Sequence, residues 1–115
     1  MGRVFTQLGR CGEANIRTSI VVAAELRFGA AKKGSQRLTT QLEAILAVME
    51  VLPLGPPVDQ IYGWLRAKLE SAGMPIGGND MLIAAHALAS DCVLVTDNER
   101  EFSRVEGLSI ENWLR

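Results

Sequence analysis

The segment 92–96 (CVLVT) is apolar at almost every position, and this feature most constrains the fold. A strand with one solvated face alternates polar and apolar residues, whereas an uninterrupted apolar strand is covered on both faces. Coverage of both faces is typical of a mainly parallel sheet packed between helices. The segment therefore predicts an α/β domain.

Helical patterns surround this strand, which supports the same class. Ser19 is the expected N-cap of a helix over 20–33 that stops at Gly34, and Asn79 is the expected cap of a helix that runs to about residue 90. Further helices are predicted over 35–50 and 58–73, with a helical turn over 99–103; further strands are predicted over 15–18, 51–54 and 108–110. Helices that alternate with short apolar strands favour a layered α/β fold.

Size and composition fit one ordinary globular domain. The chain has 115 residues, of which 48% are hydrophobic and 22% charged, with a formal net charge of −1. It lacks the basic excess by which many nucleic-acid binders are recognised. A polyanion would therefore be held by a local patch or through a metal ion.

Cysteine content and the N-terminal sequence indicate the compartment. The two cysteines, Cys11 and Cys92, have no CxxC spacing, which argues against a zinc site and against a disulfide scaffold. No apolar run approaches the roughly 20 residues that span a bilayer, and the first ten residues have no apolar signal-peptide core. We therefore predict a cytoplasmic protein.

Three carboxylates stand where an α/β chain can direct them to one cleft. Glu25 interrupts an apolar helix start, Asp80 opens an apolar helix, and Asp97 follows the strand 92–96. Ligands of parallel sheets bind outside the carboxyl ends of the strands, where these residues are expected. Hard cations such as Mg²⁺ or Mn²⁺ prefer carboxylate oxygens, so the pattern favours metal-assisted chemistry on a phosphate.

Each of these residues also has a structural interpretation. Asp80 is a favourable first-turn charge, Asp97 is a good turn residue, and Glu25 is the least easily explained as a surface residue. His86, alone among alanines and leucines, is more typical of a packing or partner residue than of a catalytic base.

Taken together, three segments resemble one family. They are 18–29 (TSIVVAAELRFG), 76–88 (IGGNDMLIAAHAL) and 94–98 (LVTDN) continued through Glu101 and Phe102, with Trp113 near the C-terminus. Their order and spacing resemble PIN-domain ribonucleases, specifically the VapC-type toxins of type II toxin–antitoxin pairs. The match runs from about residue 16 onward, and the combination is far more specific than any one segment.

The resemblance implies a three-layer α/β/α fold and Mg²⁺- or Mn²⁺-dependent endonucleolytic cleavage of RNA, commonly structured RNA such as tRNA. Carried over by position, Glu25, Asp80 and Asp97 are the metal-binding acids, and Thr96 and Asn98 are near neighbours of the site. The family also implies homodimers and a cognate antitoxin that lies across the cleft.

One departure from the family is pronounced. The family opens on a strand that ends in an Asp, the first metal ligand, but the only acid before Glu25 is Glu13. We therefore expect a single PIN-like domain over 1–115 that is N-terminally shortened, lacks its first strand and leaves neighbouring strand edges unpaired. The resulting expectation is an impaired ribonuclease.

Two other functions compete with this one. The first is a catalytically inactive interaction module that dimerises or binds the antitoxin through its apolar helices. The second is a phosphoacceptor or nucleotide-binding domain, which is less favoured because no phosphate-cradling glycine-rich loop is present.

Overall fold

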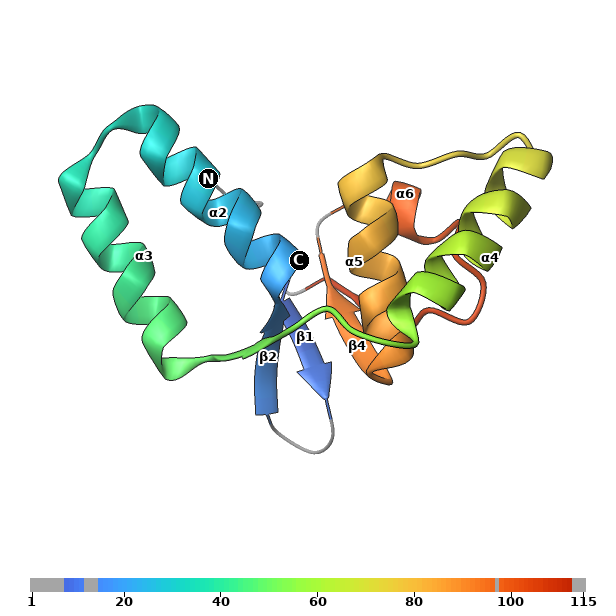
Figure 1. Ribbon diagram of the computed structural model, residues 1–115, viewed down its shortest axis with the longest axis horizontal. Helices are drawn as coiled ribbons and strands as arrows, with labels where there is room; N and C mark the ends of the chain where they lie inside the picture. Colours follow the sequence, from blue (N-terminus) through green and yellow to red (C-terminus); the bar gives the residue numbers. More distant parts are fainter. Residues whose placement is uncertain (1–7, 12–14, 97, 113–115) are drawn as a thin grey trace.

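The computed structural model describes residues 8–11, 15–96 and 98–112, and it is an α/β domain (Figure 1). Its elements, in chain order, are β1 (Leu8–Cys11), β2 (Asn15–Ser19), α2 (Ile20–Lys33), α3 (Gln36–Val48), β3 (Glu50–Leu52), α4 (Val58–Ser71), α5 (Gly78–Ala89), β4 (Cys92–Val95), α6 (Glu99–Phe102) and β5 (Ile110–Glu111). The predicted α/β class is confirmed, with most element bounds within two residues of the expected ones.

A five-stranded sheet runs through the domain in the order β3-β2-β1-β4-β5. The pairs β2–β3 and β4–β5 are parallel, whereas β1 is antiparallel to both of its neighbours. Two predictions are therefore wrong. The sheet is mixed, not mainly parallel, and the centre of the sheet is occupied by a strand that the sequence did not predict.

The direction of β1 follows from the length of its connection. Only three residues separate Cys11 from Asn15, and a parallel pair needs a crossover of about a dozen residues or more. The expectation that β2 and β4 have unpaired inner edges is also wrong, because β1 pairs with both. The sequence signal was weak, since Gly9 and Arg10 are poor strand formers.

Helices α2 and α3 form a hairpin that projects from the sheet on one side of Figure 1. Helix α2 begins where the Ser19 hydroxyl accepts the Val21 N–H at 3.0 Å, and it ends at Gly34, whose φ of 66° suits glycine. A small apolar cluster joins the two helices: Ala23, Ala30, Leu42 and Leu46. Their packing explains why the hairpin holds its shape away from the main core.

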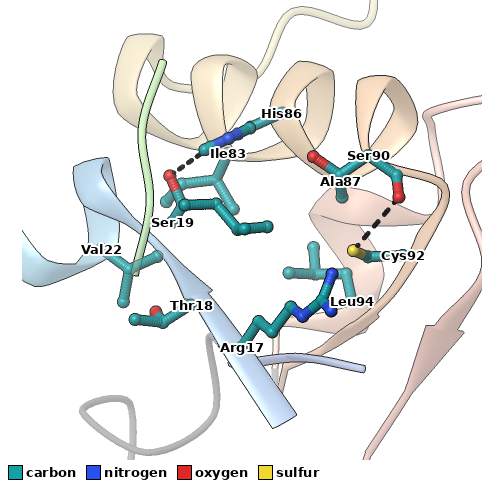
Figure 2. A pocket seen from close by; sticks show the side chains of 11 residues that line it. Arg17, Thr18, Ser19, Val22, Ile83, His86, Ala87, Ser90, Cys92 and Leu94 are labelled. Carbon is teal, nitrogen blue, oxygen red and sulfur yellow. Dashed lines mark hydrogen bonds between the residues drawn. The ribbon is translucent and has the colours of Figure 1, made fainter. Parts of the chain in front are cut away.

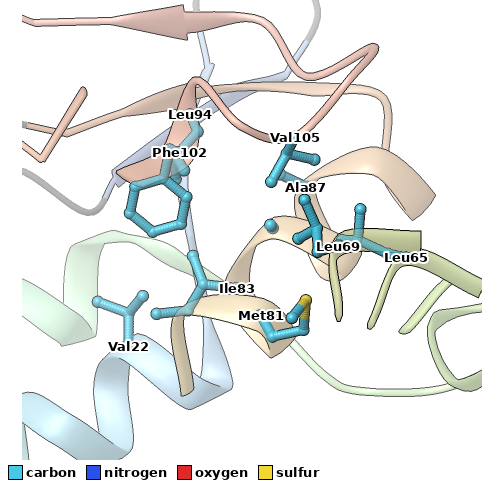
Figure 3. Packing of buried hydrophobic residues seen from close by; sticks show 10 residues of the cluster. Val22, Leu65, Leu69, Met81, Ile83, Ala87, Leu94, Phe102 and Val105 are labelled. Atoms are coloured by element: carbon cyan, nitrogen blue, oxygen red, sulfur yellow. The ribbon is translucent and has the colours of Figure 1, made fainter. Parts of the chain in front are cut away.

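The main core lies between α4, α5, β4 and the end of α6, on the other side of Figure 1. Figure 3 shows its largest members, among them Phe102, which is fully buried. The others drawn there include Leu65, Leu69, Met81, Ile83, Leu94 and Val105. This core fixes the start of α5 and the turn after β4 in place, and both carry predicted site residues.

Two local details differ from the sequence interpretation. The N-cap of α5 is Gly77, so Asn79 lies inside the first turn and does not cap the helix. Cys92 is disulfide-bonded, which the sequence analysis did not anticipate, and it lies opposite Cys11 in the register of β1 and β4. Across the described ranges, no helix combines the length and the apolar character needed to cross a membrane.

Candidate acidic site

The candidate site lies where β4 ends and α2, α5 and α6 approach one another. After Val95 the chain passes through Thr96, which is fully buried and whose hydroxyl accepts the Asn98 N–H at 3.0 Å. This local hydrogen bond turns the chain out of the sheet and into α6. The turn places Asn98 and α6 at the carboxyl end of β4, as expected for an α/β site.

Glu25 and the start of α5 are in direct contact. Glu25 is half-buried on α2, and its Oε2 accepts a hydrogen bond of 3.1 Å from Asn79 Nδ2. Asp80, the next residue, is also half-buried and lies in the first turn of α5. Two of the three predicted acids therefore come from helices far apart in sequence to one edge of the domain.

Glu101 is an additional acid that the sequence analysis did not select. Its Oε1 accepts the Gly77 N–H at 2.8 Å, and its Oε2 accepts a hydrogen bond of 3.1 Å from Asn98 Nδ2. Its carboxyl group is also hydrogen-bonded to that of Asp80. Glu101 thus links α6 to the beginning of α5 and lies beside a predicted site residue.

The spacing of Asn98 and Glu101 is the sequence signal that could have identified this acid. A capping residue followed three positions later by Glu is typical of a helix N-terminus at which the Glu turns back. Here the Glu101 side chain turns back to the Asn98 amide and also reaches α5, which only the tertiary structure reveals.

The environment lowers the pKa of Glu101. The Gly77 N–H contributes most, and the Asn98 amide, the Asp80 carboxyl group and the nearby Arg104 act in the same direction, whereas partial burial opposes them. Two carboxyl groups in hydrogen-bonding contact cannot both be ionised cheaply unless they share a proton or a cation. The pair is therefore a place where a bound cation would relieve repulsion.

We expect Glu101→Gln to weaken the dependence of the protein's stability on pH in the acidic range. A carboxyl group whose pKa is depressed on folding stabilises the native state above its ordinary pKa. That stabilisation is lost as the pH falls below about 4.5 and through the lowered value. Melting temperatures measured from pH 3 to pH 7 should fall less steeply in the variant than in the parent. Glu70→Gln, which replaces an exposed acid of α4 that pairs with Arg66, is measured alongside as the control for loss of one carboxylate away from this site.

The third predicted acid, Asp97, lies outside the described residues, as does Trp113. Within the described ranges, no three His, Cys, Asp or Glu side chains are arranged closely enough to hold a metal ion. The reversed central strand adds no carboxylate: its first residue, Leu8, lies opposite Val95 at this edge, and the sequence has no acid before Glu13. Glu25, Asp80 and Glu101 are therefore the acids that side-chain hydrogen bonds connect to the start of α5.

His86 lies away from the acids, at a small cavity between β2 and α5 (Figure 2). The cavity has a volume of about 30 Å³, enough for about two water molecules. The His86 ring is 4% exposed, and its Nδ1 lies 2.7 Å from the Ser19 hydroxyl. The prediction that His86 is a packing or partner residue is confirmed.

Comparison with known proteins connects this arrangement to a nuclease family. The family model described as "PIN domain" matches residues 6–108. "Ribonuclease VapC2" of Rickettsia felis is 40% identical over 99 residues, which cover 85% of this chain and 74% of the relative. "tRNA(fMet)-specific endonuclease VapC" of Salmonella typhimurium is 36% identical over 96 residues, which cover 83% of this chain and 73% of the relative.

Solved structures give the same result for the fold. The crystal structure of VapBC2 from Rickettsia felis, bound to a promoter DNA fragment, matches with a TM-score of 0.78 and 39% identity. That match covers 84% of this chain and 74% of the other. VapBC-1 from nontypeable Haemophilus influenzae matches with a TM-score of 0.79 and 33% identity, covering 92% of this chain and 76% of that one.

Proposed function

Because this chain belongs to the PIN-domain family, we propose that it is a metal-dependent endoribonuclease of toxin–antitoxin type that hydrolyses phosphodiester bonds in RNA. The observation that carries the proposal is that Glu101 of α6 and Glu25 of α2 are both hydrogen-bonded to the start of α5, where Asp80 lies. Acids gathered at the carboxyl end of β4 suit a hard cation and, through it, a phosphate.

The chemical type of these side chains suits Mg²⁺ or Mn²⁺. Nucleases of this family generally need a divalent metal, and carboxylate oxygens are the ligands that these ions prefer. We assign Glu25, Asp80 and Asp97 as the metal-binding acids and add Glu101 as a further one. If these acids hold a cation, it would supply a lowered pKa for a bound water and would neutralise charge developing on the phosphate.

The neighbouring side chains have supporting roles in this proposal. Asn79 donates to Glu25 and thereby orients that carboxylate, as outer partners of metal ligands commonly do. The Thr96 hydroxyl holds the backbone of Asn98, and the Asn98 amide holds Glu101. With a net charge of −1, the chain depends on the cation and on local contacts to bring a polyanion to these acids.

The central strand favours a second, weaker function. The family's first metal ligand ends a first strand, whereas β1 here runs antiparallel to β4 and brings no acid to the site. Cleavage is therefore expected to be slow, and a catalytically inactive interaction module is the alternative. In either case we propose an antitoxin as a partner, because similar proteins have been solved as VapBC complexes. A second copy of the chain is proposed as well, on the family resemblance alone.

The direct test is cleavage of RNA by the purified chain. We would incubate it with tRNA(fMet) and with an unstructured RNA of equal length, in millimolar Mn²⁺ or Mg²⁺ and in excess chelator. The initiator tRNA is the first choice because one relative is named for it. Metal-dependent appearance of discrete internal cuts, absent with chelator, is the expected result.

Other outcomes select between the two functions. No cleavage at any metal concentration, together with a stable dimer in light scattering, would replace the nuclease by the interaction module. Cleavage that persists in chelator would contradict the role of the acidic site. A homodimer that also cleaves RNA would support both the proposed activity and the proposed assembly.

A further inference from the structure

Two side-chain contacts join α2 to α5, each at a different position along the helices. At the acidic end, Asn79 Nδ2 donates to Glu25 Oε2 at 3.1 Å. At the other, His86 Nδ1 lies 2.7 Å from Ser19 Oγ (Figure 2). The contacts are six residues apart along α2 and seven along α5, or roughly 9 and 10 Å at 1.5 Å per residue. Nearly equal spacings mean that the two contacts together fix how α2 lies against α5.

The hydrogen bonding of His86 is that of a neutral imidazole. Burial lowers the pKa of His86, and this effect exceeds the opposing one of the Pro53 carbonyl, which accepts a hydrogen bond from the ring. Since Nδ1 faces Ser19, we assign Nε2–H to Pro53. The Ser19 hydroxyl already accepts the Val21 N–H at 3.0 Å, so its own proton is free to go to Nδ1.

Resting on the proposed function, we propose that His86 is a positioning residue of the acidic site. By holding the Ser19 cap, its buried ring anchors the start of α2 to α5 and so sets the separation of Glu25 from Asp80. Its hydrogen-bond partners among the described residues include no acid, so it acts on the site through the two helices. A divalent cation is the ligand whose binding depends on this separation, because it needs oxygens at fixed positions.

Filling of the core would not require a histidine at this position. His86 is 4% exposed among apolar neighbours that include Ile83 and Ala87, where a leucine of similar volume would carry no polar cost. The histidine instead connects three segments of chain: the Ser19 cap, α5 and the residues after β3. Such a connection is useful if the relative placement of those segments matters.

The test compares two pairs of matched variants in the full chain. His86→Leu removes both hydrogen bonds and keeps the volume, whereas His86→Asn keeps an acceptor near the Nδ1 position. Ser19→Ala removes the hydroxyl that contacts His86. Its control is Ser35→Ala, because Ser35 caps α3 by accepting the Leu38 N–H at 3.1 Å and, among the described residues, forms no hydrogen bond with α5. Binding of MnCl₂ is measured by calorimetry well below every melting temperature.

We expect His86→Leu and Ser19→Ala to weaken Mn²⁺ binding about tenfold, a typical effect of an outer residue on a metal site. Turnover of RNA should fall by a similar factor with KM nearly unchanged. Affinity should remain within twofold of the parent in Ser35→Ala and be largely restored in His86→Asn. Unchanged Mn²⁺ affinity in His86→Leu and in Ser19→Ala would overturn the positioning role, even if both variants melt earlier.

Amide hydrogen exchange separates failure of this inference from failure of the proposed function. If the parent binds no Mn²⁺, the proposed metal site is wrong. Exchange in the first turn of α2 then still decides whether His86 anchors that helix, since it requires no metal. Faster exchange there in His86→Leu, but not in Ser35→Ala, supports the anchor, and unchanged exchange overturns it.

Discussion

Asp80→Asn should reduce metal-dependent RNA cleavage by about 100-fold or more and abolish stabilisation by Mn²⁺. Asp80 is half-buried in the first turn of α5, and its carboxyl group contacts that of Glu101. An amide has nearly the same shape but supplies no negative charge to a cation. Charge stabilisation by a bound metal is worth several kcal/mol, and each 1.36 kcal/mol is a factor of ten in rate.

The thermal readout of the same variant is independent of any RNA. A ligand at about 100 times its dissociation constant stabilises a protein by roughly 2.7 kcal/mol. For a domain of this size we expect Mn²⁺ to raise the parent's melting temperature by roughly 8–16 °C and that of Asp80→Asn hardly at all. Binding of an antitoxin or of a second copy should survive the substitution, because it does not depend on the cation.

Asp59→Asn is the matched control for Asp80→Asn. Asp59 also lies in the first turn of a helix, α4, but it is exposed and away from the acidic site. Both substitutions remove a favourable first-turn charge worth about 0.3–1 kcal/mol. Only Asp80→Asn should change the response to Mn²⁺. Equal responses in the two variants would mean that Asp80 serves its helix and not a metal.

Phe102→Ala should destabilise the domain by roughly 3–5 kcal/mol, the cost of removing a large buried aromatic ring. Phe102 is fully buried and packs in the cluster with Ile83, Leu94 and Val105 (Figure 3). For a denaturant slope of about 2 kcal/mol/M, the midpoint of urea unfolding should fall by roughly 1.5–2.5 M. A loss of this size is a large part of the 5–15 kcal/mol typical of a domain.

Phe28→Ala is the corresponding control on the surface. Phe28 is 67% exposed on α2, where the Lys32 ammonium lies 6.0 Å from its ring centroid. An exposed contact of this kind is worth about 0.5–1 kcal/mol at most. A midpoint that falls as far in Phe28→Ala as in Phe102→Ala would contradict the position of the core between α4, α5 and β4.

Helices were the most predictable part of the fold because their signals are local. Ser19 and Gly34 delimit α2 through their own hydrogen bonds and backbone angles, so the sequence and the structure agree on Ile20–Lys33. The strand β4 was equally predictable, since its apolar run requires cover on both faces. The resemblance of the 18–29 and 76–88 segments to PIN domains agrees with the family match over residues 6–108.

The central strand could not be predicted for the opposite reason. Leu8–Cys11 has little strand propensity of its own, and it becomes a strand because the inner edges of β2 and β4 offer unpaired N–H and C=O groups on both sides. Its antiparallel direction then follows from the short connection to β2. Neither cause is visible in the four residues themselves.

The acidic site was likewise predictable only in part. Sequence alone determined that Glu25 and Asp80 are acids set in apolar helices, with Asp97 after a buried strand, and so that a carboxylate site is expected. Only the tertiary structure decided that Glu101 joins Asp80, that Asn79 holds Glu25, and that His86 ties Ser19 to α5. The physical reason is the distance along the sequence over which each interaction acts. Caps and apolar patterns act within a few residues, whereas contacts between side chains more than 20 residues apart exist only once packing has brought their helices together.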